Sequence, residues 1–320
     1  MSAVCFLGVD GGGTKTRFVL IDGAGRTLAL AQRGTIYHPQ VGLDGVRDIL
    51  ADGVGEVLHH AGLRHDDIRH AFFGLPAYGE DSGIAPRLHA IPGEVLGHAR
   101  YAADNDMVCG WAGSLACADG INIIAGTGSM GYGRRNGEAA RAGGWGELFS
   151  DEGSAHWIAV QGLNAFSRMS DGRLPQGPLH ALFKQQLGIE RDLDLCAKLY
   201  GEQACTRGEV AALSRIVAEA AQTGDAQAQA IYAQAGRELA AIADALRITL
   251  GFAPGETVPL SYSGGAFNIG TLLMEPFAQA LHAACPAFEL RTPLFEPHIG
   301  AALHAARLVG HVIDPTCIAP

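Results

Sequence analysis

The sequence predicts an α/β protein built from two related domains, and two observations carry this prediction. Short apolar segments of strand type alternate with segments of helical periodicity, a pattern typical of a partly parallel sheet. One layout also occurs twice, starting at Val4 and at Ile121: an apolar strand, a Gly/Thr-rich loop, a second strand, a polar glycine turn and a third strand. A repeat about 115 residues apart indicates a duplicated domain rather than an array of short repeats.

The first copy of this layout begins the chain. Its three strands are joined by glycine turns, which predicts an antiparallel meander. Over the first part of the chain we expect strands at Val4–Val9, Arg17–Ile21 and Thr27–Gln32, a helix at Leu43–Leu63, strands at Ile68–Leu75 and Ala99–Ala103, and a helix at Asp106–Cys117.

The second copy is followed by a mainly helical stretch before the sheet resumes. We expect strands at Ile121–Ala125, Tyr132–Arg135 and Glu138–Ala142, helices at Ser154–Met169, Leu179–Leu187, Gly208–Gln222 and Ala226–Leu250, a strand at Val258–Tyr262, a helix at Asn268–Ala284, a short strand at Phe288–Leu290 and a last helix at His298–Val309. This predicts one domain over residues 1–118, a second with helical insertions over 119–297, and a C-terminal helix, 298–310, that joins the first domain.

Composition excludes several classes of protein. The chain has 320 residues, 48% hydrophobic and 18% charged, with a formal charge of −10, which indicates a globular protein without the basic patch of a nucleic-acid binder. No apolar stretch is long enough to span a membrane, and the first ten residues carry no basic leader. The seven cysteines are scattered without a CxxC pair, so we expect no disulfide framework and no zinc site, and a reducing, cytoplasmic environment.

Three glycine-rich turns, each after an apolar strand, are candidates for binding phosphate. They are Asp10–Thr16, Gly126–Ser129 and Ser263–Ala266. Glycine lets the backbone approach a ligand closely and point successive N–H groups at an anion. Hydroxyl groups that could add donors stand at Thr14, Thr16, Thr127 and Ser129. A tight hairpin also needs glycine, so each turn alone fits a purely structural role, and only the coincidence of three turns favours polyphosphate binding.

Two other phosphate motifs do not fit. Gly126–Gly131 matches the dinucleotide fingerprint as a string, but that fingerprint opens a helix and the chain here continues as a hairpin. Lys15 is not a P-loop lysine, because the order Gly-x-x-x-x-Gly-Lys-Ser/Thr is absent.

The segment Asp104-Asn105-Asp106 stands at the end of an expected strand and the start of an expected helix. Reacting groups of open α/β sheets gather outside the carboxyl ends of strands. A carboxylate there can accept the hydroxyl proton of a substrate during phosphoryl transfer. One of these residues could instead serve as the helix N-cap, and both roles are compatible because one carboxylate can cap while its neighbour reacts.

The segment Gly143–Trp157 contains an unusual combination of glycines, tryptophan and carboxylates. Asp151 and Glu152 are compatible with a simple helix start, where acidic residues are favoured. A flat aromatic ring such as Trp145 beside carboxylates also suits a polyhydroxyl ring, which has an apolar face and a polar rim. None of the thirteen histidines shows the spacing of metal ligands.

Taken together, these motifs resemble those of the acetate and sugar kinase/heat-shock protein/actin superfamily. Within it they look like the BadF/BadG/BcrA/BcrD-type ATPase branch that contains N-acetylglucosamine kinase. Val9–Lys15 resembles the first phosphate motif, Ala125–Ser129 the second and Ser263–Ala266 the adenosine motif. Gly143–Gly146 followed by Asp151–Ser154 is similar to the amino-sugar kinase motif and is the most specific of the four. The resemblance spans nearly the whole chain in the right order.

This resemblance implies two RNase H-like, actin-like ATPase domains that close on ATP and a sugar in an interdomain cleft. The γ-phosphoryl group would pass to the sugar 6-hydroxyl, with Asp106 at the position of the catalytic base, Asp104 as the alternative, and Asp10 organising Mg²⁺ through water. The residues implied for ATP are Gly11, Gly12, Gly13, Thr14, Lys15, Gly126, Thr127, Gly128, Ser129, Gly264, Gly265 and Ala266. Those implied for the sugar are Tyr37, His38, Asp106, Gly144, Trp145, Gly146, Asp151 and Glu152. The resemblance also implies a homodimer.

One departure from the family pattern bears on the substrate. The amino-sugar kinases carry an asparagine that contacts the sugar in the loop after the third strand, whereas this loop reads Gly34–Pro39 with Tyr37 at about that position. N-acetylglucosamine is the leading expectation, followed by glucosamine or another hexose derivative. Two alternative functions are an ATPase that activates a 2-hydroxyacyl-CoA dehydratase through a shared iron–sulfur cluster, for which Cys109 and Cys117 are the candidate thiolates, and a sugar sensor without turnover.

Overall fold

The computed structural model of the chain describes residues 4–201 and 204–318. These residues divide into two compact units. Unit 1 contains the residues up to Asp119 and those from Thr292 onward, and unit 2 contains Gly120–Arg291. The chain thus leaves unit 1 once and returns to it. Residues 292–297, which the sequence pattern had grouped with the second domain, lie in unit 1 with the helix that follows them.

Unit 1 is built on a mixed five-stranded sheet. Its strands are β1 (Cys5–Gly11), β2 (Lys15–Asp22), β3 (Thr27–Gly34), β4 (Ile68–Leu75) and β5 (Tyr101–Asn105), in the spatial order β3-β2-β1-β4-β5. The first three strands pair antiparallel as the expected meander, and β4 and β5 add to β1 in parallel. The carboxyl ends of β1, β4 and β5 therefore meet at one edge of the sheet.

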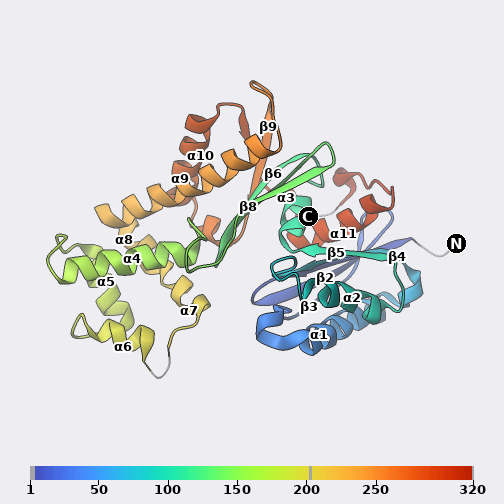
Figure 1. The fold of residues 1–320 in the computed structure, drawn as a ribbon, viewed down its shortest axis with the longest axis horizontal. Coiled ribbons are helices and arrows are strands. Elements are labelled where there is room, and N and C mark those ends of the chain that lie inside the picture. Colours follow the sequence, from blue (N-terminus) through green and yellow to red (C-terminus); the bar gives the residue numbers. More distant parts are fainter. Residues whose placement is uncertain (1–3, 202–203, 319–320) are drawn as a thin grey trace. The chain divides into compact units, whose positions relative to one another are not determined.

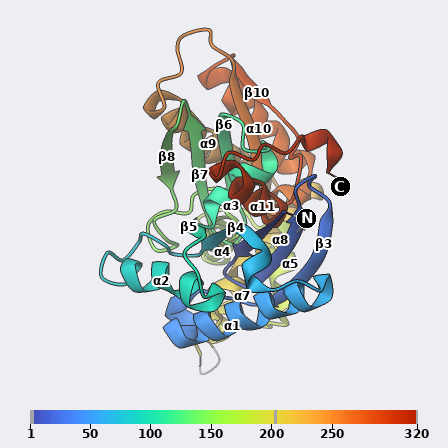
Figure 2. The same cartoon turned by 90° about the vertical axis from the view of Figure 1, so that its right-hand side faces the viewer.

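Helices cover both faces of this sheet (Figures 1 and 2). They are α1 (His38–Ala61) and α2 (Ala85–Leu96) on one face, and α3 (Met107–Ser114) and α11 (Pro297–Leu308) on the other, with short 3-10 turns at His65–Asp67 and Pro315–Cys317. Successive side chains of β1 point to opposite faces of the sheet, which explains the two layers of helices. Leu7 and Val9 point to one face and pack in the apolar cluster with α1. Gly8 faces α11 instead. A Cβ on Gly8 would lie 2.4 Å from the backbone nitrogen of Ala302, so glycine permits this close crossing.

Unit 2 repeats the same sheet. Its strands are β6 (Gly120–Ala125), β7 (Ser129–Arg135), β8 (Glu138–Gly143), β9 (Val258–Ser263) and β10 (Phe288–Leu290), in the spatial order β10-β9-β6-β7-β8. Strands β6, β7 and β8 pair antiparallel, and β9 and β10 extend the sheet in parallel with β6. Strand order and direction match those of unit 1 element for element, as the duplicated layout predicted.

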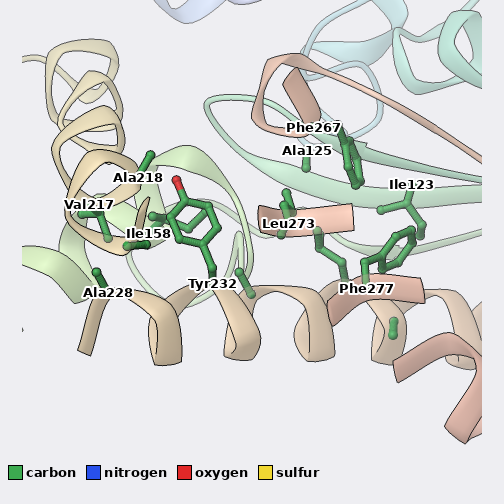
Figure 3. Close-up of a cluster of buried hydrophobic side chains, with 14 of the residues drawn as sticks. Ile123, Ala125, Ile158, Val217, Ala218, Ala228, Tyr232, Phe267, Leu273 and Phe277 are labelled. Carbon is green, nitrogen blue, oxygen red and sulfur yellow. The ribbon is translucent and has the colours of Figure 1, made fainter. Parts of the chain in front are cut away.

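The helices of unit 2 surround a larger apolar core. They are α4 (Ala155–Ser170), α5 (Pro178–Leu187), α6 (Asp194–Tyr200), α7 (Arg207–Ala212), α8 (Ser214–Gln222), α9 (Ala226–Thr249) and α10 (Thr271–Ala284), and a 3-10 turn spans Gly265–Ile269. Figure 3 shows α9 carrying Ala228 and Tyr232 toward Val217 and Ile158. The Tyr232 hydroxyl donates to the backbone oxygen of Ser214, 3.3 Å away, which satisfies this buried polar group.

Several expected helices differ in extent from those observed. The helix expected at Leu43–Leu63 begins earlier, at His38, because Pro39 suits a first helical turn and Gly42 then absorbs a kink with φ of 70°. The stretch expected as one helix, Gly208–Gln222, is two helices that separate at Leu213. Helices α2 and α6 were not expected. No helix within the described ranges is long and apolar enough to cross a lipid bilayer.

Candidate active site

In unit 1, the candidate acidic residues gather at the carboxyl edge of the parallel strands. Register places Asp10 of β1 beside Gly74 of β4, and Gly74 beside Asp104 of β5. Residues paired in this way project from the same face, here the face that carries α3 and α11. Gly74 lies between Asp10 and Asp104 in the sheet and carries no side chain. A Cβ at Gly74 would lie 2.3 Å from Sγ of Cys109 and 3.1 Å from Cα of Asp106.

Asp106 follows β5 and immediately precedes α3. The cap of this helix comes from the neighbouring amide, since the backbone N–H of Met107 donates to Oδ1 of Asn105 at 3.2 Å. The side chain of Asp106 makes no capping hydrogen bond, although the residue stands at the N-cap position. Asp104 is exposed, and its carboxylate accepts from the backbone N–H of Asn105 at 2.7 Å. Neither carboxylate is therefore needed to cap the helix.

The two acidic side chains of this edge both have raised pKa values, and the charge of Asp10 contributes to the shift of Asp106. Burial raises the pKa of Asp10 to about 6, against the opposing attraction of Arg17 and Lys15. Burial, followed by the negative charges of Asp10 and Glu80, raises the pKa of Asp106 to about 7. A carboxyl group with a pKa near neutrality can both hold and accept a proton at physiological pH, which is the property of a general base.

The side chain of Cys109 lies next to these carboxylates. It is fully buried, and its thiol lies 3.6 Å from the backbone oxygen of Val9. Burial first, and then the charges of Asp10, Asp106 and Asp104, raise the pKa of the Cys109 thiol well above its usual range. Cys109 therefore stays a neutral thiol at physiological pH.

The first glycine-rich turn joins β1 to β2 and is fixed by neighbouring backbone and hydroxyl groups. The N–H of Gly12 donates to the carbonyl of Lys15 at 2.9 Å, and the hydroxyl of Thr35 donates to the carbonyl of Gly12 at 2.8 Å. Gly13, Thr14 and Lys15 are exposed. Their backbone and side chains are accessible to an anion.

Not every predicted donor of this turn is free. The hydroxyl of Thr16 is buried and donates to the carbonyl of Gly34 at 2.8 Å, so it ties β2 to β3. The expectation that Thr16 contributes a phosphate donor is therefore wrong.

Tyr37 and His38 lie close to this turn. The hydroxyl of Thr35 accepts from the N–H of Tyr37 at 3.0 Å, and the same hydroxyl bonds Gly12. Tyr37 is the N-cap of α1, and His38 begins the helix, so these residues stand at a helix start rather than in a loop. Nδ1 of His38 is buried with no hydrogen-bond partner among the described residues. An orphaned buried nitrogen of this kind is available to a polar ligand.

In unit 2, the second glycine-rich turn is attached to the start of α4. The N–H groups of Ala155 and His156 donate to the carbonyls of Gly126 and Thr127, at 2.9 and 3.3 Å. The hydroxyl of Ser129 donates to the carbonyl of Glu152 at 2.7 Å. Ser129 is therefore occupied through its hydroxyl, which corrects the expectation that this hydroxyl serves a phosphate, whereas Thr127 is exposed.

Asp151 is held beneath this turn. It is 3% exposed, adopts a left-handed backbone with φ of 61°, and its carboxylate pairs with Arg207 of α7 and accepts from the N–H of Ser129. Burial raises the pKa of Asp151, and the charge of Arg207 opposes that effect. Glu152 is half-buried and accepts from the hydroxyl of Ser150 at 3.1 Å.

The loop before Asp151 exposes large apolar side chains. Trp145 is 71% exposed, Leu148 90% and Phe149 72%. Gly144 and Gly146, on either side of the tryptophan, have φ of 71° and 102°, conformations that favour glycine. Glycine adopts these conformations without strain, so Trp145 is exposed between two turns that only glycine accommodates easily.

The third turn lies at the same edge of the unit 2 sheet as the second. Strands β6 and β9 are parallel, with Ile124 paired to Ser263, so their ends are adjacent. Gly264 has φ of 100°, and a Cβ there would lie 2.3 Å from the backbone oxygen of Ala125. The predicted adenosine residues Gly264, Gly265 and Ala266 are therefore brought beside Gly126.

The residues of the unit 1 edge fit a bound magnesium ion. Mg²⁺ prefers oxygen ligands, keeps several waters and uses one or two carboxylates. Loss of solvation is the main cause of the raised pKa values of Asp10 and Asp106, and a divalent cation nearby would stabilise their ionised forms. Within the described residues, no cluster of three or more His, Cys, Asp or Glu side chains is arranged to hold a metal directly.

Some residues of the site were not predicted from the sequence. Arg207, Gly74 and Cys109 were not assigned to it, and Asn105 was only one of three candidates for the cap. The preference of asparagine for N-caps could have found Asn105. A glycine ending an apolar strand could have pointed to Gly74. No local signal connects Arg207 with Asp151, which lies 56 positions earlier.

Two sheets of the same order, each with glycine-rich turns at the carboxyl edge of its parallel strands, define the two-domain actin-like fold of sugar kinases. The chain belongs to the BadF/BadG/BcrA/BcrD ATPase family, whose model matches residues 7–305. Membership in this family of ATPases implies the use of ATP.

Individual proteins are similar to the chain over nearly its whole length. It is 28% identical to the N-acetyl-D-glucosamine kinase of Dictyostelium discoideum, over 95% of this chain and 98% of that protein. It is 27% identical to the N-acetylmuramic acid/N-acetylglucosamine kinase of Clostridium acetobutylicum, over 93% and 97%. A crystal structure from Chromobacterium violaceum, of a protein proposed to be an N-acetylglucosamine kinase, matches with a TM-score of 0.73 and 27% identity, over 95% of this chain and 99% of that one.

Proposed function

We propose that the protein is an ATP-dependent amino-sugar kinase that transfers the γ-phosphoryl group to the 6-hydroxyl of its substrate, with Asp106 as the general base. The observation that carries the proposal is the state of Asp106. Its carboxyl group caps no helix, faces the same sheet edge as Asp10 and has a pKa of about 7. A base with this pKa can take the hydroxyl proton while the phosphoryl group is transferred.

ATP would be bound largely by backbone groups. In unit 1 the turn at Gly11–Lys15, which is exposed at Gly13, Thr14 and Lys15, supplies N–H donors, the hydroxyl of Thr14 and the charge of Lys15. In unit 2 the turn at Gly126–Gly128 supplies N–H donors and the hydroxyl of Thr127, and Gly264–Ala266 lies beside it for the adenosine. When bound, Mg²⁺ would neutralise phosphate charge, and Asp10 would hold it through water. Catalysis then rests on positioning and charge neutralisation.

The sugar would be held by polar and aromatic side chains. Trp145 offers an exposed ring to an apolar sugar face, and Gly144, Gly146 and Glu152 offer polar groups for the hydroxyls. In unit 1, the unpartnered Nδ1 of His38 can bond a sugar hydroxyl. We include Tyr37 and Asp151 in the sugar-binding set, Tyr37 for its position beside the turn and Asp151 because it directly precedes Glu152 in the chain.

N-acetylglucosamine is the substrate that we propose first, followed by glucosamine. Two relatives, each similar over nearly the whole chain, are named for kinases of N-acetylglucosamine, and one of them also for N-acetylmuramic acid. Tyr37 distinguishes this chain at a position where an asparagine was expected, so a substituent different from N-acetyl is the main alternative.

The iron–sulfur alternative receives less support from the arrangement of the thiols. Cluster ligation requires thiolates supplied by two subunits. Cys109 and Cys117 are both buried, and burial keeps the Cys109 thiol protonated.

We also propose a cytoplasmic homodimer. Seven free cysteines support the compartment, and the family resemblance supports the assembly. Light scattering of the purified protein would test the dimer.

The test of the function is a coupled ADP-release assay with Mg-ATP. The panel is N-acetylglucosamine, glucosamine, N-acetylmannosamine, N-acetylmuramic acid, glucose and no sugar. We expect strong release with one amino sugar and little without sugar. Equal slow release in every reaction would reject the kinase and favour the activator ATPase. Tyr37→Asn, assayed on the same panel, should move the preference toward N-acetylglucosamine if Tyr37 contacts the substituent.

A further inference from the structure

The guanidinium of Arg207 reaches away from its own helix to the second glycine-rich turn. Arg207 is the first residue of α7, whose start is fixed by a capping box between Thr206 and Glu209. From there Nη2 of Arg207 bonds Oδ2 of Asp151, and Nε lies 3.2 Å from Oε2 of Glu147. The guanidinium of Arg207, at the start of α7, therefore lies at the turn that we propose to bind ATP.

The guanidinium lies directly against the backbone of that turn. A Cβ on Gly128 would be 2.6 Å from Nη2 of Arg207 and 2.7 Å from Oδ2 of Asp151. Any other residue at position 128 would push this ion pair away. Glycine at 128 thus serves the position of Arg207 as well as the approach of a ligand.

The two carboxylates orient Arg207 without using all of its donors. A guanidinium has five N–H donors in a planar fork, and the contacts to Asp151 and Glu147 use Nη2 and Nε. Asp151 is buried and anchored by the N–H of Ser129, so it cannot follow the arginine outward. The Arg207 side chain is 39% exposed, which leaves part of the fork accessible beside the turn.

We propose that Arg207 is a phosphate-binding residue, which contacts phosphate oxygens of the nucleotide held at Gly126–Gly128 while Asp151 and Glu147 hold its guanidinium in place. This inference rests on the proposed function. Arginine matches phosphate geometry through paired N–H donors, and such charge-assisted bonds are the strong ones. The arrangement also explains why a carboxylate is buried beneath an anion site, where it would otherwise repel the ligand: its charge is neutralised by Arg207 and it fixes the arginine's orientation.

The experiment measures nucleotide affinity without sugar, by calorimetry in the presence of Mg²⁺. ATP, ADP and adenosine are titrated into the wild-type protein, Arg207→Gln, Arg207→Lys and Arg215→Gln. Arg215 is an exposed arginine of α8 and serves as the matched control. We expect Arg207→Gln to weaken ATP and ADP by about 10- to 100-fold, because one charge-assisted phosphate contact is lost, and to leave adenosine unchanged. Arg207→Lys should recover part of the loss, and Arg215→Gln should resemble the wild type.

A second variant guards against misfolding, because Arg207→Gln leaves Asp151 buried without its partner. The double variant Asp151→Asn/Arg207→Gln removes both charges and should show the same loss for ATP and ADP. If both variants weaken adenosine as much as ATP, or bind ATP as the wild type does, Arg207 has only a structural role and the inference is overturned. If the wild-type protein binds no ATP, the proposed function fails together with the inference.

Discussion

Replacing Asp106 by asparagine removes the charge and keeps the shape of the proposed base. The structure predicts opposite effects on catalysis and on stability. Turnover should fall by about 10²- to 10⁴-fold, the usual contribution of a general base. Stability relative to the wild type should rise at neutral pH, because the variant no longer has to ionise a half-buried, poorly solvated group beside Asp10.

The size of the stability effect follows from the shift in pKa. The pKa of Asp106 rises from 3.8 to about 7 on folding. A raised folded-state value contributes stability below the unfolded pKa, and that contribution is lost as pH rises through the folded one. The wild type therefore loses about 1.4 kcal/mol per pH unit relative to the variant across this window. Between pH 5 and pH 8 the difference should change by about 2–3 kcal/mol in favour of the variant.

Urea denaturation of both proteins at pH 5, 6, 7 and 8 measures this change, and the coupled assay measures turnover. Asp104→Asn is the matched control, because Asp104 is exposed on the same edge. It should leave turnover within a few-fold of the wild type. Intact turnover in Asp106→Asn with loss in Asp104→Asn would move the base by two residues. A stability difference independent of pH would refute the buried, charge-coupled state of Asp106.

Three further substitutions test other parts of the structure. Gly264→Ala should destabilise the protein by about 2 kcal/mol or more and lower its melting temperature, because φ of Gly264 is 100° and a Cβ would lie 2.3 Å from a backbone oxygen of β6. An unchanged melting temperature would contradict this geometry. Lys184 and His180 hold the pKa of Asp192 well below its usual range, so their stabilisation is complete above the unfolded pKa of 3.8 and is lost only as the pH falls through the lower folded value. Asp192→Asn should cost about 1–3 kcal/mol at pH 7 in urea denaturation, and the cost should begin to fall below pH 4 and keep falling toward pH 2; a cost that does not change with pH would argue against it. Trp145→Ala should raise the KM for the sugar without lowering the melting temperature, since the ring is 71% exposed; an unchanged KM would remove Trp145 from the proposed site.

The sequence by itself determined the sheets and the turns. The central strands β1, β4 and β6 are short, mainly apolar runs followed by glycine or polar residues, and that signal is local. The expected strand at Ile68–Leu75 agrees with β4 at both ends. The repeated layout predicted two related domains, and the two sheets have the same strand order. Helix α2 was missed because Pro86 and Pro92 fall within it and read as helix breakers. The break between α7 and α8 was missed because both pieces pack on α4, a contact with no trace in helical periodicity.

The tertiary structure alone decided the electrostatics of the site. The motifs pointed to Asp10 and Asp106, but only the sheet register and the burial around Cys109 set their pKa values apart from those of exposed carboxylates. In the same way, only the fold carries Arg207 back to Asp151 and seats it against Gly128. Burial and charge proximity depend on residues far apart in the chain, whereas strands and turns depend on neighbours. For that reason the sequence located the chemical groups, and the packing determined the state in which they act.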